Sequence, residues 1–125
     1  MKYILGDIGN TSTKVCILNN KFKIIRSFNF ETIKIFKKNF LKNKLKNNLN
    51  KNLNSNLLFS SVVPPAFKEI KKIFKSTKFK LLEIKEFDLD KIIKINVKNK
   101  KQLGSDRIAN AIGAKQFKNC LILDF

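Results

Sequence analysis

Residues 3–14, with the sequence YILGDIGNTSTK, decide how the first part of this chain folds. The apolar run Tyr3-Ile4-Leu5 predicts a buried strand, and Asp7 stands where that strand gives way to a flexible turn. The turn supplies a glycine for close approach of the backbone, hydroxyl groups and a positive charge, from Gly9, Thr11, Thr13 and Lys14. A carboxylate followed by such a turn has the outline of a loop that binds phosphate groups.

The composition limits the protein to one modest core. A chain of 125 residues has room for one domain and buries roughly two thirds of the surface that its unfolded form exposes. The apolar start is too short for a signal peptide or a membrane span, so we expect a cytoplasmic protein without membrane contact.

Cys16 and Cys120 lie in apolar runs and are expected to be buried free thiols. Histidine is absent, which leaves acid–base chemistry to carboxylates or lysines.

The net charge of +18 raises the possibility of nucleic-acid binding, because clustered cations displace counterions from a phosphate backbone. The cationic residues are scattered through every segment, and only Arg26 and Arg107 are arginines. Lys, Asn, Ile and Phe have A/T-rich codons, so a genome of low G+C content produces the same bias. We therefore consider a basic nucleic-acid binder an unlikely alternative, to be recognised by steeply salt-dependent binding.

The hydrophobic periods predict alternating strands and helices up to residue 84. The order of these elements is β-β-β-α-β-α-β, which indicates a mixed α/β sheet with crossover helices. The predicted elements are strands at 2–7, 14–18 and 21–30, a helix from Ile33 to about Leu45, a strand at 57–63, a helix that begins at Pro64-Pro65, and a strand at 79–84.

The remaining segments have weaker patterns. We predict a short strand near Ile93–Val97, a helix over Ser105–Lys118 and a final apolar strand over Cys120–Phe125. The segment Asn43–Asn56 is almost wholly Lys, Asn and Leu, and no function is assigned to it.

Four short blocks, in this order along the chain, carry a resemblance to a known family. They are Asp7-Ile8-Gly9-Asn10-Thr11, Ser60-Ser61-Val62-Val63-Pro64, Leu103-Gly104-Ser105-Asp106-Arg107 and Leu123-Asp124-Phe125. The chain resembles type III pantothenate kinase, a member of the actin, sugar kinase and heat-shock ATPase superfamily with a ribonuclease H-like fold. Such kinases are about twice as long, so the resemblance implies an N-terminal half. It divides the chain into an actin-like ATPase domain, residues 1–102, and a substrate-loop helix with the first strand of a second domain, residues 103–125.

The resemblance implies a function and a set of site residues. The family phosphorylates pantothenate to 4'-phosphopantothenate with ATP and Mg²⁺, the first step of coenzyme A biosynthesis, and its members are homodimers. Asp106 is implied to be the catalytic base, facing Asp7 across a single cleft, and Asp124 is implied to help bind K⁺ or NH₄⁺. The implied ATP-binding residues are Asp7, Ile8, Gly9, Asn10, Thr11, Ser12, Thr13 and Lys14, and the implied pantothenate-binding residues are Gly104, Ser105, Asp106 and Arg107.

Plainer interpretations stand beside these. The first block is also compatible with a hairpin turn capped by Asp7. In the same way, Ser105 and Asp106 are compatible with an ordinary helix cap. Val97 stands where the family often has tyrosine, which removes one contact to pantothenate, and Ser60–Pro64 is expected to be structural. The function alternatives are another phosphotransferase of the superfamily and an inactive remnant, and we do not expect the 125 residues to be active alone.

Overall fold

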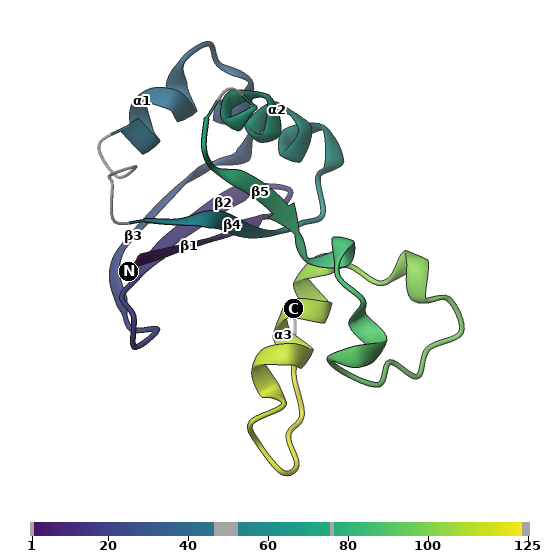
Figure 1. Cartoon of the computed structure of the whole chain (residues 1–125). Helices are drawn as coiled ribbons and strands as arrows, with labels where there is room; N and C mark the ends of the chain where they lie inside the picture. The colour runs from purple at the N-terminus through teal and green to yellow at the C-terminus, as the bar shows by residue number, and fades with distance from the viewer. Residues whose placement is uncertain (1, 47–52, 76, 124–125) are drawn as a thin grey trace.

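The structure is a computed structural model, and it describes residues 2–46, 53–75 and 77–123. Its centre is a five-stranded mixed sheet in the order β3-β2-β1-β4-β5 (Figure 1). β1 pairs antiparallel with β2 and parallel with β4, while β2–β3 is antiparallel and β4–β5 is parallel. The strands are β1 (Lys2–Ile8), β2 (Ser12–Leu18), β3 (Ile24–Glu31), β4 (Leu53–Ser61) and β5 (Lys80–Glu83). The predicted element order up to residue 84 and the mixed α/β class are therefore confirmed.

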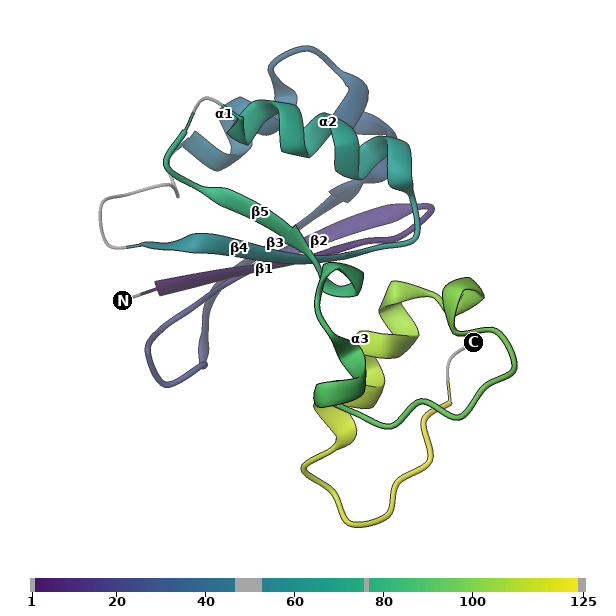
Figure 2. The same ribbon diagram turned by 45° about the vertical axis from the view of Figure 1, so that its right-hand side comes forward.

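One face of the sheet is covered by two helices, α1 (Phe40–Lys46) and α2 (Pro64–Phe74) (Figures 1 and 2). α2 begins with two prolines, whose fixed backbone angle suits the first helical turn, and it buries one apolar stripe against the sheet. The main core lies between these layers and includes Ile4, Ile8, Val15, Ile17, Leu57, Phe59, Ala66, Ile70 and Phe74.

The third helix, α3 (Ser105–Ala114), lies across the sheet from α1 and α2 (Figure 2). It packs against β4 and the 3-10 turn η2 (Ile84–Glu86) and buries Ile108. The connector between η2 and α3 contains two more 3-10 turns, η3 (Leu89–Lys91) and η4 (Lys100–Gln102). α3 is thereby brought back to the carboxyl end of β4.

The prediction of one continuous helix from Ile33 to Leu45 was wrong. A 3-10 helix, η1 (Thr32–Phe36), precedes α1, and the chain turns between them at Asn39, whose φ is 61°. Asparagine tolerates this left-handed conformation better than most residues. The break also changes the buried face, because Ile33 and Phe36 are 65% and 49% exposed, whereas Ile35, Leu41 and Leu45 are buried.

The third strand begins later than the predicted Lys21. Asn19 accepts hydrogen bonds from the backbone N–H groups of Lys21 and Lys23 through its Oδ1. Phe22 adopts a φ of 56° in this turn and stacks its ring on Tyr3. The turn therefore occupies residues that the alternating pattern had assigned to the strand.

The predictions beyond residue 84 were less accurate. No strand forms over Ile93–Val97, and α3 ends at Ala114 rather than at Lys118. Cys120–Leu123 is irregular and exposed, so Cys120 is not the buried thiol that we expected, and Cys16 is half-buried. The remainder of that predicted strand, residues 124–125, lies outside the described residues. No helix within the described ranges is long and apolar enough to cross a membrane.

Candidate active site

The strand register places three polar residues in one row across the sheet. Asp7 of β1 is paired with Lys14 of β2 on one side and with Ser60 of β4 on the other. Directly paired residues project from the same face of a sheet. This face is opposite to α1 and α2, because the neighbouring positions Ile8 and Phe59 belong to the core beneath those helices.

Ser60 orients the carboxylate of Asp7. The Ser60 hydroxyl donates a hydrogen bond of 2.6 Å to Asp7 Oδ1, and only 7% of the Ser60 surface is exposed. A hydrogen bond to an ionised acceptor is among the stronger kinds in proteins. The buried Ser60 hydroxyl thus fixes the Asp7 carboxylate on the strand side of the site. The Asp7 side chain itself remains exposed.

A cavity of about 390 Å³ lies over this row. A second row of paired residues, Leu5, Cys16 and Leu58, forms its apolar part, and α3 contributes Asp106, Ala109 and Asn110. The cavity therefore has one carboxylate from the sheet, Asp7, and one from α3, Asp106, with Lys14 beside the first. The strongest expectation from the sequence, that these two acidic residues share one cleft, is confirmed.

Asp106 lies in the first turn of α3, where its carboxylate folds back to the helix start. Its Oδ1 accepts a hydrogen bond of 2.8 Å from the backbone N–H of Arg107. Gly104 precedes the helix, and a Cβ at this position would overlap Asp106 Oδ1. A glycine is consequently needed for this arrangement, and the positive end of the helix lies next to the carboxylate.

The loop between β1 and β2 is fixed by backbone and threonine contacts. The Gly9 N–H donates to the Ser12 carbonyl at 3.0 Å, and the Thr32 hydroxyl donates to the Gly9 carbonyl at 2.6 Å. Asn10, Thr11 and Ser12 are exposed but do not line the cavity.

Two members of the predicted ATP-binding segment have side chains in the interior. Ile8 and Thr13 are both 0% exposed, and the Thr13 hydroxyl is 2.9 Å from the hydroxyl of Thr32. The expectation that the Thr13 hydroxyl is offered to a ligand was therefore wrong. The reason is strand alternation: Thr13 is paired with Ile8 on the helix-covered face, whereas Lys14 points to the other face.

The remaining predicted residues are divided between the surface and the interior. Arg107 is exposed and Ser105 is 1% exposed, and neither lines the cavity. The Ser105 hydroxyl has no hydrogen-bond partner among the described residues. Val97 is 45% exposed and also lies outside the cavity lining. Asp124 falls outside the described residues.

Three side chains of the cavity wall with a polar or thiol group were not among the predicted site residues, namely Ser60, Cys16 and Asn110. Asn110 follows Asp106 by four residues, which is the spacing that puts two side chains on one helix face, so its position was recoverable. Ser60 ends a parallel strand next to β1, but its contact with Asp7 depends on the register, which the sequence does not state.

This arrangement suits chemistry on a phosphorylated substrate. Two carboxylates and one lysine converge on a cavity with an apolar side, and the described residues contain no group of three or more Cys, Asp or Glu side chains that could hold a metal by themselves. A magnesium ion bound through one or two carboxylates, water and substrate phosphates is compatible with such a set.

Comparison with known proteins agrees with the resemblance. Residues 3–125 match the family model described as type III pantothenate kinase. A protein of Pelagibacter ubique (strain HTCC1062), named type III pantothenate kinase, is 49% identical over 124 residues, which cover 98% of this chain. The chain spans about half the length of this curated relative, 50%. By the match to the family model over nearly its whole length, the chain belongs to the type III pantothenate kinase family.

Proposed function

We propose that this chain supplies the ATP- and pantothenate-binding half of a kinase that converts pantothenate to 4'-phosphopantothenate. The observation that carries the proposal is the single cavity lined by both Asp7 and Asp106. Phosphoryl transfer needs positioning and charge neutralisation more than covalent catalysis. A nucleotide site on the strands and an alcohol site on α3, open to the same cavity, meet that need.

The fold supports a ribonuclease H-like, actin-like half-unit. Its three antiparallel strands are followed by two parallel ones, giving the order β3-β2-β1-β4-β5 with helices on one face. We infer a division into residues 1–102, the nucleotide-binding domain, and residues 103–125, the start of the part that carries the substrate. The packing of α3 against β4 and η2 brings these two parts into contact.

The strand side of the cavity is the proposed nucleotide site. Lys14 supplies a positive charge for phosphate oxygens, and the loop Gly9–Thr11 supplies exposed backbone and hydroxyl groups beside it. Asp7 offers carboxylate oxygens, which Mg²⁺ prefers, and Ser60 keeps that carboxylate in place. When bound there with ATP, Mg²⁺ neutralises charge on the phosphates.

Asp106 is the proposed general base. The pantothenate hydroxyl transfers its proton to the Asp106 carboxylate as its oxygen forms a bond to the γ-phosphorus of ATP, and the bond to the ADP oxygen breaks. ADP leaves with the electron pair of that bond. Asn110, one turn later on α3, lines the same cavity and is suited to hydrogen-bond the acceptor substrate.

Two parts of the proposal rest on the family alone. Asp124 is proposed to contribute to a K⁺ or NH₄⁺ site, and the complete enzyme is proposed to be a homodimer. No step of the transfer is derived from a monovalent cation.

The proposal is tested with a chimera in which this chain replaces the matching half of the Pelagibacter ubique relative. The measurement is pantothenate-dependent ADP release in a coupled assay, with sugars and acetate offered as other acceptors. We expect turnover with pantothenate, and Asp106→Asn is expected to reduce it by about 10²-fold or more while ATP affinity stays within about twofold. Asp88→Asn is the matched control, because Asp88 lies in the connector and pairs only with exposed Lys91, so its turnover should be unchanged.

Three results would contradict the proposal. A folded chimera without turnover would indicate an inactive remnant, and preference for a sugar or acetate would indicate another phosphotransferase. Equal losses for Asp106→Asn and Asp88→Asn would show that the Asp106 carboxylate has no special part in proton transfer.

A further inference from the structure

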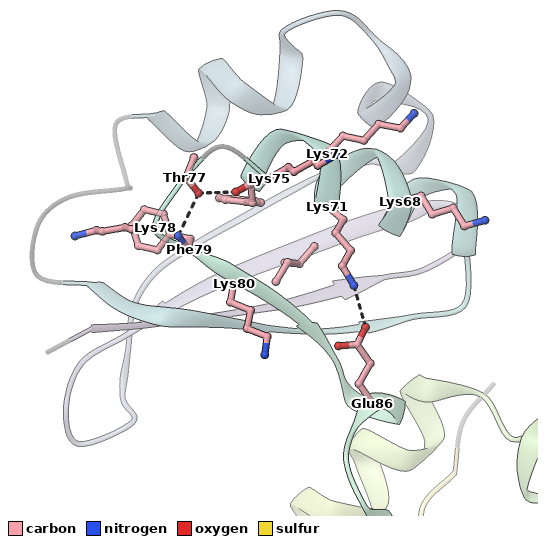
Figure 3. A pocket seen from close by; sticks show the side chains of 11 residues that line it. Lys68, Lys71, Lys72, Lys75, Thr77, Lys78, Phe79, Lys80 and Glu86 are labelled. Atoms are coloured by element: carbon pink, nitrogen blue, oxygen red, sulfur yellow. Dashed lines mark hydrogen bonds and ion pairs between the residues drawn. The ribbon is translucent and has the colours of Figure 1, made fainter.

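A second, larger hollow lies between α2 and β5, an edge strand of the sheet. Its volume is about 640 Å³, and it shares no lining residue with the cavity of Asp7 and Asp106 (Figure 3). Pockets that hold small organic ligands have volumes of roughly 300–1,000 Å³. The hollow is therefore large enough for such a ligand, and the proposed kinase chemistry does not use it.

The floor of this hollow is apolar and held in shape by local contacts. Phe74 and Phe79 meet edge to face, with ring centroids 6.3 Å apart, and Leu81 of β5 lies beside them. Thr77 fixes the turn between α2 and β5, because its hydroxyl donates to the Phe74 carbonyl at 2.8 Å and accepts from the Phe79 N–H at 3.2 Å. Phe74 and Leu81 are each 3% exposed and form the buried base of the hollow, so the apolar surface open to a ligand comes from half-buried Phe79 and the lysine stems.

The mouth of the hollow is lined almost wholly by cations. Glu86 is the one carboxylate in the lining, and it is 3.1 Å from Lys71, while Lys72 pairs with Glu69 outside the lining. The lysines of the lining are Lys68, Lys71, Lys72, Lys75, Lys78 and Lys80. For four of them, Lys68, Lys75, Lys78 and Lys80, no carboxylate lies within ion-pair distance in the described ranges.

Some of the lining side chains point into the hollow, and others point outward at its margin (Figure 3). Lys71 extends from α2 towards Glu86, and Lys80 is the first residue of β5, whereas the ammonium groups of Lys68 and Lys78 lie at the outer margin. A lysine stem can lie along apolar surface while its charge stays in water. The apolar floor is thus surrounded by positive charges on flexible stems, which can close on an anionic group.

We propose that this hollow binds a small amphiphilic anion, with its apolar body against Phe79 and the lysine stems and its anionic group among the lysine ammonium groups. Charge complementarity selects an anion, since the uncompensated side chains of the lining are all cationic. The apolar floor selects a ligand with a hydrocarbon or ring portion over inorganic phosphate. A fatty acid or an organic phosphate with an apolar tail has this chemistry.

A single-stranded nucleic acid fits the hollow less well. Proteins that bind single strands stack bases on exposed aromatic faces along a groove. Phe79 is only partly exposed, the Lys78 ammonium lies 5.4 Å from its ring centroid, and Phe74 is buried. Phe79 is therefore the one ring of the lining that is open at all, and a single half-buried ring does not make the row of stacking faces that a nucleic-acid strand needs.

The experiment titrates the 125-residue chain with decanoate by calorimetry. Decyltrimethylammonium, which has the same tail and the opposite charge, is the ligand control. The test variant is Lys75→Gln with Lys78→Gln and Lys80→Gln, and the protein control is Lys94→Gln with Lys98→Gln and Lys101→Gln. Both variants lose the same charge from exposed positions, and the control residues lie outside the lining. Circular dichroism verifies that both are folded.

We expect the test variant to weaken decanoate binding by about tenfold or more, because it removes three of the four lining lysines that have no ion-pair partner in the described ranges, and the control variant to change it by less than about twofold. Equal weakening in both variants would overturn the proposal in favour of a diffuse positive field. Equal binding of decyltrimethylammonium and decanoate would overturn the charge selection. A single-stranded oligonucleotide that binds at this site and resists displacement by decanoate would replace the proposed ligand with nucleic acid.

Discussion

β4 presents two different environments on its two faces. Leu57 is 0% exposed beneath α1 and α2, whereas its neighbour Leu58 is half-buried in the wall of the cavity under α3. In the same way Ser60 faces Asp7, while Ser61 uses its hydroxyl to accept a hydrogen bond of 3.1 Å from the backbone of Val63. Adjacent residues of one type therefore have different tasks, which depend only on the face to which they point.

The contrast between the two faces of the sheet shows how a small domain combines a polar site with a hydrophobic core. The helix-covered face is apolar and closely packed and contributes most of the hydrophobic stabilisation. The other face lies under α3 and Ile84 of η2, and its polar row lines an open cavity. Substitutions on the first face should change the free energy of unfolding, and substitutions on the second should mainly change ligand binding.

The largest expected effect separates the two leucines. Leu57→Ala should lower the free energy of unfolding by about 2–5 kcal/mol, because it removes a fully buried side chain and leaves a cavity. Leu58→Ala should lower it by only about 1 kcal/mol, because that side chain already borders open space. Chemical denaturation followed by circular dichroism measures both, and equal losses would refute the contrast between the faces.

A smaller effect is expected at Gly6, where the strand has no side chain. A Cβ at Gly6 would overlap the ring of Phe59, its partner in β4, so Gly6→Ala should destabilise the fold by about 1–3 kcal/mol. Gly113→Ala is the matched control: nothing lies near its added Cβ, and alanine in a helix should be neutral or stabilising by up to about 1 kcal/mol. Thermal unfolding compares the pair, and an unchanged midpoint for Gly6→Ala would contradict the close approach of Phe59.

The smallest change in stability, about 1 kcal/mol, is expected for Ser60→Ala, which removes one hydrogen bond. If Asp7 serves the nucleotide, the same change should weaken binding of ATP with Mg²⁺ by about tenfold, because the carboxylate loses the group that orients it. Calorimetric titration of the chimera measures this affinity.

Two controls test whether Ser60 acts by positioning Asp7. Ser60→Thr retains the hydroxyl and should restore most of the ATP affinity. Ser61→Ala should leave that affinity unchanged, since Ser61 bonds its own turn. Loss of affinity in Ser61→Ala equal to that in Ser60→Ala would show that the effect arises from disturbance of β4 rather than from Asp7.

The strands and the two carboxylates were predictable because their signals are local. Short apolar runs ended by turn residues identified all five strands of the sheet, and the block around Asp106 identified the first turn of α3. That Asp7 and Asp106 meet was an expectation from the family resemblance, and the packing of α3 against β4 fulfils it.

The predictions that failed concern features that depend on contacts between distant parts of the chain. The break at Asn39 was not visible in the sequence, because Ile33, Phe36 and Phe40 recur at helical spacing although the structure exposes the first two. Thr13 was assigned to a ligand because a turn was expected there, but β2 begins at Ser12 and alternation turns Thr13 inward. The connector after η2 lies away from the sheet, so no core imposes a period on its residues.

The outer strands of the sheet differ in a way that bears on solubility. β5 has four residues and begins with exposed Lys80, so it offers another chain little backbone to pair with. β3 has eight residues and exposes Ile24 and Ile25 by 60% and 49%. Any strand-to-strand aggregation at high concentration should therefore begin along β3, and a lysine or proline introduced there would suppress it.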